Sequence, residues 1–247
     1  MQIDEIFEAD KRIKKKKRTT PLLNSPFLDE IADRQIFIKA ECLQHTGSFK
    51  FRGAYSAISS IPIEKRKKGV IAYSSGNHAQ GVAFAAKIHK IPATIIMPED
   101  APEIKINNTK DLGAEVILYD RLSENREKIG QKISEERLLS LIPPYDHNDV
   151  IAGQGTIGLE IASQAEQIGI GKADVLVCCG GGGLTSGIAV ALSTLMPDFV
   201  TRPVEPEGFD DVVRSLKTGE RQTNKKISGG LCDAIITPTP GKLTFPL

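Results

Sequence analysis

The chain has 247 residues, a formal net charge of +1, 40% hydrophobic residues and 26% charged residues. A chain of this length forms one large domain or two small ones and has enough apolar material for a core. The near-zero net charge gives no basis for a nucleic-acid-binding surface. The N-terminus, from Met1 to Glu5, contains no apolar signal segment. We therefore expect a cytoplasmic protein that binds neither nucleic acid nor membrane.

Three stretches suggest special chemistry but have ordinary explanations. Seven of the eight residues in Lys11–Arg18 are basic, and a solvated face or loop explains such a run better than a binding patch does. The uncharged stretch Val175–Pro197 is long enough to cross a membrane, but its five glycines would disrupt a spanning helix. The cysteines lack metal-ligand spacing, and we expect them to be buried, reduced thiols; they are Cys42, Cys178, Cys179 and Cys232.

Short β-rich runs alternate along the chain with helical patterns, which is typical of parallel α/β construction. The predicted strands are Ile36–Lys39, Val70–Tyr73, Ala93–Met97, Glu115–Tyr119 and Val175–Cys179. Apolar residues at helical spacing predict helices between them, in the sets 51/54/55/58, 79/82/83/86 and 157/161/165/168. Gly113 and Gly169 stand where helices are expected to end.

Three turns lead from predicted strands or extended segments into predicted helices. We name them the lysine turn (Thr46–Lys50), the serine turn (Ser74–His78) and the glycine turn (Gly180–Gly183). Backbone N–H groups at a helix N-terminus are unpaired and carry partial positive charge, so they bind anions. In open α/β sheets, ligands collect at the carboxyl ends of the strands. The sequence therefore predicts a cleft for an anionic ligand, formed by all three turns.

Lys50 has an unusual position for a lysine, just inside a predicted helix start. The positive end of a helix disfavours an ammonium ion and favours the neutral amine. A neutral amine is the form that attacks a carbonyl group. An ordinary surface charge remains the alternative explanation.

The other two turns carry groups suited to a carboxylate and a phosphate. In the serine turn, small hydroxyl residues and a glycine form either a simple helix cap or a nest of N–H groups for a carboxylate, with the Asn77 amide available to a cofactor hydroxyl. His78 taken alone would more often be a packed histidine than a catalyst. The four glycines of the glycine turn cost conformational entropy, and we find no packing value for them in the sequence. Close approach of the backbone to a phosphate would explain them. The turn lacks both the lysine of a P-loop and the glycine spacing of a dinucleotide-binding motif.

Together these features resemble a known family. The resemblance is carried by Lys39–Lys50, Ser74–Gly81, Ala152–Thr156 and Gly180–Gly183. In this order they resemble fold-type-II pyridoxal-phosphate (PLP) enzymes, in the threonine/serine dehydratase (threonine ammonia-lyase) and serine racemase branch. The resemblance implies a fold like the tryptophan synthase β subunit, with two three-layer parallel-sheet lobes. Residues 1–51 and 147–247 would form the large PLP-binding lobe, and residues 52–146 the small lobe.

The resemblance also implies roles for individual residues. Lys50 would carry PLP and then remove the Cα proton, and Ser75 would act as an acid on the opposite face, as in serine racemases. Asn77 would bind the ring hydroxyl of PLP, and Gly180, Gly181, Gly182 and Gly183 would bind its phosphate. The substrate carboxylate would contact Ser74, Asn77 and His78. Glu205, Asp211 and the carbonyl of Phe209 would hold Mg²⁺ or Ca²⁺, although a solvated turn explains the two acids equally well and Pro203 interrupts the strand before them.

The implied reaction is dehydration and deamination of L-threonine or L-serine to 2-oxobutanoate or pyruvate, with release of ammonia. Two alternatives stay open: a serine racemase, favoured by Ser75, and an inactive truncated remnant or one half of a split protein. Family members continue beyond the position of Leu247, so the resemblance implies an incomplete large lobe and weak activity for this chain alone. It implies a homodimer for the full-length plan, and it does not rank serine against threonine.

Overall fold

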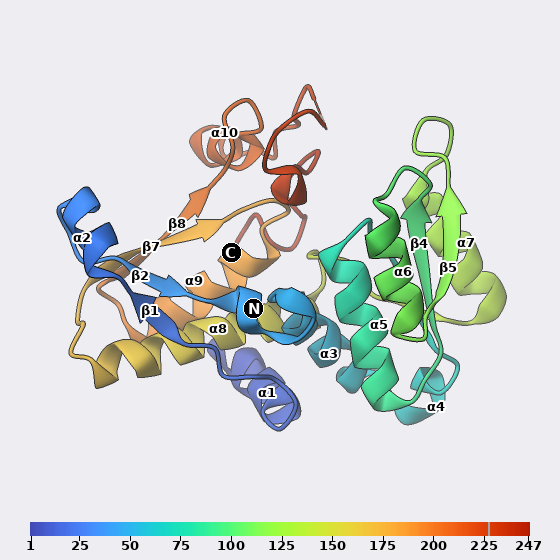
Figure 1. Ribbon diagram of the computed structural model, residues 1–247, viewed down its shortest axis with the longest axis horizontal. Helices are drawn as coiled ribbons and strands as arrows, with labels where there is room; N and C mark the ends of the chain where they lie inside the picture. Colours follow the sequence, from blue (N-terminus) through green and yellow to red (C-terminus); the bar gives the residue numbers. More distant parts are fainter. Residues whose placement is uncertain (227) are drawn as a thin grey trace.

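The computed structural model describes residues 1–226 and 228–247, and Figure 1 shows two lobes side by side. The helices are α1 (Ile3–Ile13), α2 (Pro26–Ala32), α3 (Lys50–Ser60), α4 (Ile63–Arg66), α5 (Asn77–His89), α6 (Glu103–Asp111), α7 (Arg126–Arg137), α8 (Asn148–Gln167), α9 (Gly183–Leu195) and α10 (Asp211–Thr218). The strands are β1 (Leu22–Asn24), β2 (Phe37–Lys39), β3 (Val70–Tyr73), β4 (Ala93–Pro98), β5 (Glu115–Tyr119), β6 (Ser140–Leu141), β7 (Ala173–Cys178) and β8 (Phe199–Val204).

One lobe is built on a parallel sheet with strand order β5-β4-β3-β6. Side chains alternate across its two faces, as the pleat requires. On one face Val70 and Ile95 join the core formed with α3, α5 and α6, while on the other Ile71 and Ile96 pack against α7. Figure 1 shows these helices on either side of the strands. This lobe therefore has three layers.

The other lobe holds the parallel pair β7–β8, with α8 and α9 packed on one face. On the opposite face Leu176 and Val200 are exposed, so the described part of this lobe has two layers. Pro203 lies in β8, which pairs only with β7 within the described residues. An edge strand tolerates a residue without an N–H group, which explains how the proline is accommodated. The predicted α/β class with parallel sheets is confirmed.

Helix α3 contacts both lobes. Phe51 and Ile58 lie in the same core as α5. A Cβ atom added to Gly53 would overlap the Gln154 amide nitrogen on α8, so the two helices approach closely there. The predicted division of the chain near residues 51 and 147 stays a prediction; α3 begins near the first of these positions and packs closely on α8, which begins near the second.

The predicted strands and helix ends agree with the structure to within two residues. Gly113 and Gly169 follow α6 and α8 with φ values of 92° and 73°, the left-handed conformation that glycine adopts without strain. The sequence analysis did not predict β1 and β6, which have only three and two residues. Within the described residues, no helix has the length and apolar character needed to span a bilayer.

Two predictions about burial are wrong. All four cysteines are free, but only Cys179 is buried; Cys42, Cys178 and Cys232 are exposed because they lie in turns or on an uncovered face. The basic run is not wholly solvated. The Lys17 side chain is only 7% exposed, because its ammonium group lies 2.7 Å from the buried carboxylate of Glu160.

Candidate active site

Lys50 is the first residue of α3, and its side chain points into the protein rather than to solvent. Its ammonium nitrogen donates a hydrogen bond to the carbonyl oxygen of Pro144, at 2.6 Å. Burial lowers the pKa of the Lys50 amine to about 8, and the neighbouring Cys178 opposes this shift only in part. At neutral pH about a tenth of the amine is therefore neutral and nucleophilic, far more than for an ordinary lysine.

The structure brings the three predicted turns together around Lys50. Helix α5, which starts in the serine turn, packs tightly on the lysine turn: a Cβ atom added to Gly81 would lie 3.1 Å from the Lys50 carbonyl carbon. Cys178, which is close enough to Lys50 to affect the pKa of its amine, lies two residues before the glycine turn. The Lys50 amine is held by the carbonyl group of Pro144. Tyr145 is the next residue, and its ring lies against Gly181 of the glycine turn. A short path of contacts thus links the lysine turn to the other two.

The serine turn leads from β3 into α5 and offers groups without partners. The Gly76 N–H donates to Ser74 Oγ at 3.2 Å, which shapes the turn. Within residues 1–226 and 228–247 the side chains of Ser75 and Asn77 make no hydrogen bond, and Asn77 is exposed. A helix N-terminus with free hydroxyl and amide groups is suited to a carboxylate or a ring hydroxyl.

His78 is held by the protein itself. Its Nε2 atom lies 2.8 Å from the carbonyl oxygen of Ile142, which can only accept, so Nε2 carries the proton. Burial lowers the pKa of His78 to about 3, and the charges of Lys50 and Arg126 contribute. The ring is therefore neutral, with Nδ1 as an acceptor. This tautomer cannot donate a ring hydrogen bond to a carboxylate, so contact with a substrate carboxylate would come from the backbone N–H.

The glycine turn has unpaired N–H groups at the start of α9. Within the described residues, none of the N–H groups of Gly180 to Gly183 donates to a backbone carbonyl or a side chain. Our prediction that these glycines have no packing value is wrong. A Cβ atom on Gly181 would overlap the Tyr145 ring, and one on Gly182 would lie 2.8 Å from Thr244 Oγ1. The glycines thus permit close packing as well as exposure of backbone N–H groups.

Two cations beside the serine turn were missed by the sequence analysis. Lys105 lies against it, since a Cβ atom on Gly76 would be 3.5 Å from the Lys105 amine. Arg126 lies over the ring of Tyr73, the residue before the turn, with its guanidinium carbon 5.5 Å from the ring centroid. Both come from helices distant in sequence from residue 74, and no local motif indicates their position.

The predicted metal ligands lie at the start of α10. Glu205 accepts hydrogen bonds from the N–H groups of Val212 and Val213, both at 2.8 Å, and so caps the helix. Asp211 is 2% exposed, and within the described residues its Oδ2 atom has no partner. Burial, together with the charge of Glu205, raises the pKa of Asp211 to about 6. Among residues 1–226 and 228–247, no group of three or more His, Cys, Asp or Glu side chains could hold a metal.

A half-buried lysine lies between two helix N-termini. One N-terminus has free polar side chains and the other is rich in glycine. This arrangement defines a site for a carbonyl cofactor that carries a phosphate. The chain matches the pyridoxal-phosphate dependent enzyme family over residues 13–247. It belongs to that family, and its cofactor is pyridoxal 5′-phosphate.

The similar proteins are lyases and racemases that act on amino acids. An L-threo-3-hydroxyaspartate ammonia-lyase of Pseudomonas sp is 44% identical over 98% of this chain and 75% of its own length. A serine racemase of Schizosaccharomyces pombe is 46% identical over 87% of this chain and 66% of its own length. The crystal structure of a threonine deaminase from T.th. has a TM-score of 0.91 and 41% identity, covering all of this chain and 78% of that chain. Similar proteins are covered over 60% to 78% of their length, so the chain spans less than two thirds of some of them. The fold-type-II architecture is confirmed.

The residues present fit pyridoxal phosphate. The Lys50 amine is suited to its aldehyde, and the unpaired N–H groups of the glycine turn are suited to its phosphate. The unpartnered amide of Asn77 is suited to its ring hydroxyl. These assignments to individual residues remain predictions, as does that of Ser75.

Proposed function

We propose that this protein eliminates the hydroxyl group from 3-hydroxy amino acids, converting L-threonine or L-serine into 2-oxobutanoate or pyruvate and ammonia. The observation that carries the proposal is the Lys50 amine, which is held by the Pro144 carbonyl, has its pKa lowered to about 8 and lies between the serine and glycine turns. The names of the similar proteins support the same class of reaction.

Each group has a task set by its position. Bound pyridoxal phosphate withdraws electrons from the substrate Cα, which makes the Cα proton removable. Lys50 takes that proton, because a neutral amine with a pKa near the working pH is an effective base. The backbone N–H groups of Ser74 to His78 hold the carboxylate, and Asn77 orients the cofactor ring. The N–H groups of Gly180 to Gly183 hold the phosphate.

The test is production of 2-oxo acid from L-threonine and L-serine by the purified chain with pyridoxal phosphate. Lys50→Ala should abolish both activity and borohydride trapping of the cofactor on the chain. Lys87→Ala, at an exposed position near the end of α5, serves as the control and should change neither. Activity that survives Lys50→Ala would show that another lysine carries the cofactor.

A racemase activity is favoured by the Ser75 hydroxyl, which has no hydrogen-bond partner in the described structure and lies in the serine turn. A hydroxyl group facing Cα from the side opposite Lys50 could return a proton there. D-serine should then appear beside pyruvate, and Ser75→Ala should remove D-serine while retaining elimination. Elimination without any D-serine in the unmodified protein would exclude this activity.

A dicarboxylic substrate, 3-hydroxyaspartate, is a second candidate. Lys105 and Arg126 place two positive charges beside the turn proposed to hold the substrate's α-carboxylate. Serine and threonine have no second carboxylate to use them, whereas the Pseudomonas relative is named for such a substrate. The two cations therefore favour a substrate with an anionic group on Cβ.

We further propose that Glu205, Asp211 and the Phe209 carbonyl bind Mg²⁺ or Ca²⁺. The support is the unpartnered, buried Oδ2 atom of Asp211 beside a second carboxylate, an arrangement that a hard divalent cation would relieve. Adding either ion at 100 times its Kd should raise the melting temperature by roughly 5–10 °C. Asp211→Asn should stabilise the metal-free protein and abolish the response. An equal response in Asp211→Asn would exclude this site.

A further inference from the structure

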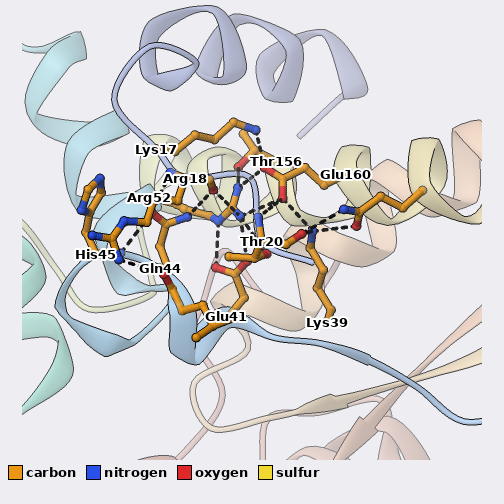
Figure 2. A network of polar contacts seen from close by, with 12 residues as sticks. Lys17, Arg18, Thr20, Lys39, Glu41, Gln44, His45, Arg52, Thr156 and Glu160 are labelled. Atoms are coloured by element: carbon orange, nitrogen blue, oxygen red, sulfur yellow. Dashed lines mark hydrogen bonds and ion pairs between the residues drawn. The ribbon is translucent and has the colours of Figure 1, made fainter. Parts of the chain in front are cut away.

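A buried polar cluster lies beside the lysine turn, centred on Arg52 and Glu160 (Figure 2). Arg52 is fully buried and makes paired hydrogen bonds with two carboxylates. With Glu41 the distances are 2.8 and 2.7 Å, and with Glu160 they are 2.8 and 3.0 Å. Two planar carboxylates therefore fix the orientation of one planar guanidinium, a geometry that a lysine ammonium cannot reproduce.

The cluster is balanced in charge once Asp10, which lies 2.8 Å from the Lys17 ammonium group, is counted with Glu41 and Glu160 against Arg52, Lys17 and Lys39. Lys17 and Lys39 each lie 2.7 Å from a Glu160 carboxylate oxygen. Burial alone would raise the pKa of Glu160, but hydrogen bonds from Arg52, Lys17 and Lys39 lower it to about 2. Buried ion pairs often contribute little net stability compared with apolar side chains of the same size. A function in fixing geometry is therefore a better explanation than stability alone.

The cluster holds the chain on both sides of the lysine turn. Arg52 follows Lys50 by two residues, and Glu41 precedes the turn. Gln44, two residues before the turn, pairs with both the N–H and the carbonyl of Arg18, at 2.9 and 2.7 Å. Glu160 brings in α8, the long helix of the other lobe. The residues that flank the turn are thus fixed to a framework outside it.

The turn itself is conformationally unfavourable. Thr46 has φ 59° and ψ 20°, in the left-handed region that a β-branched residue rarely adopts. Within the described residues the buried hydroxyl groups of Thr46 and Ser48 have no hydrogen-bond partner. Few interactions inside the turn hold it, so its shape has to be imposed by the surrounding structure.

We propose that Arg52, clamped between Glu41 and Glu160, is a positioning residue that imposes the shape of the lysine turn and so holds the Lys50 amine against the Pro144 carbonyl. Without the clamp, Thr46 would relax to a common conformation, and the start of α3 would move. The Lys50 amine would then leave the Pro144 carbonyl and gain access to water. This inference rests on the assignment of Lys50 as the cofactor lysine.

The test measures Lys50 in the full chain freed of pyridoxal phosphate. Acylation of Lys50 by a small reagent, followed by peptide mass spectrometry across a pH series, reports the titration midpoint of its amine. The unmodified protein should show a midpoint near 8. Arg52→Lys keeps the charge but not the two paired contacts, and should raise the midpoint by about one pH unit or more, toward that of an ordinary lysine. Pyridoxal phosphate should also bind more weakly.

Two control variants separate positioning from simple destabilisation. Lys39→Met removes a buried cation from Glu160 but leaves both Arg52 pairs in place. Arg12→Lys makes the same substitution in another half-buried ion pair, with Asp149. Neither should move the Lys50 midpoint, although both are expected to lower the melting temperature. An unchanged midpoint in Arg52→Lys, or an equal shift in the controls, would overturn the proposal.

Should Arg52→Lys not fold, Glu41→Gln decides the question. Glu41→Gln weakens one of the two carboxylate contacts of Arg52, at a side chain that is 13% exposed. It should raise the titration midpoint of Lys50 as well, by a smaller amount than Arg52→Lys. An unchanged midpoint there would also overturn the proposal. The titration needs no turnover, so failure of the proposed reaction and failure of the clamp are seen separately.

Discussion

At the scale of single residues, the least expected feature of the site is its positive charge. The serine turn already has a helix N-terminus to bind one carboxylate, yet Lys105 and Arg126 lie beside it. A charged hydrogen bond contributes about 1.5–3 kcal/mol. If Arg126 binds the β-carboxylate, Arg126→Met should lower kcat/KM for L-threo-3-hydroxyaspartate by roughly 10- to 150-fold. The same variant should change kcat/KM for L-serine only slightly.

Arg121→Met is the matched control, because Arg121 pairs with the exposed carboxylate of Asp100. Both substrates should be used by that variant as by the unmodified protein. Equal losses for serine and hydroxyaspartate in Arg126→Met would instead mean that Arg126 only supports the Tyr73 ring.

The sequence predicted residues of the site only where the chemistry is local. Lys50 and the glycine turn stand out because their residue types are unusual for a helix start. Tyr145, Lys105 and Arg126 have no such mark, since they reach the site through contacts between distant segments. Glu160 could not be identified from the sequence either, because a carboxylate on an amphipathic helix is normally solvated. Its burial depends on three cations from other segments.

At the scale of elements, α5 carries a histidine near each end, and both resist protonation. Burial is the main cause, with nearby cations contributing, and the pKa values are lowered to about 3 for His78 and about 4 for His89. In the unfolded chain a histidine takes up a proton below about pH 6.5. The unfolded state therefore binds more protons as the pH falls from 6.5 towards 4, and stability is lost in that window.

For His78, which is 3% exposed, the free energy of unfolding should fall by about 2 kcal/mol between pH 7 and pH 5. Urea unfolding at these two pH values measures the loss. His78→Gln should be less stable at pH 7, but its loss between the two values should be smaller by that amount. His89→Gln should show the same direction independently. A variant with the full pH dependence of the unmodified protein would contradict the assignment.

Elements with a strong periodic pattern were the ones predicted from sequence. Strands β3 and β4 are largely apolar and are buried except at Tyr73, and Gly113 and Gly169 mark helix ends through their left-handed backbone. The short β1 and β6 lack any pattern of their own and exist as strands because a neighbour pairs with them. Their formation depends on tertiary contact, which local propensity does not contain.

At the scale of the whole molecule, the lobes are joined by backbone contact between α3 and α8. A Cβ atom on Gly153 would lie 2.7 Å from both the Arg52 carbonyl oxygen and the Gly53 Cα. Backbone atoms cannot rotate away as a side chain can, so the two helices would have to separate. Because Lys50 begins α3, and Pro144 and the glycine turn lie with α8 and α9, that separation would also open the site.

Gly153→Ala should therefore be destabilising by about 1–3 kcal/mol, typical of an overpacked core. For a chain of this size, each kcal/mol lowers the melting temperature by roughly 2–4 °C. Pyridoxal phosphate should bind more weakly as well, because its proposed contacts come from both lobes. Gly171→Ala provides the control, since a Cβ atom there meets nothing within 4 Å. Calorimetry with and without the cofactor measures both effects. If Gly153→Ala melts and binds the cofactor as Gly171→Ala does, the α3–α8 contact does not hold the two halves of the site together.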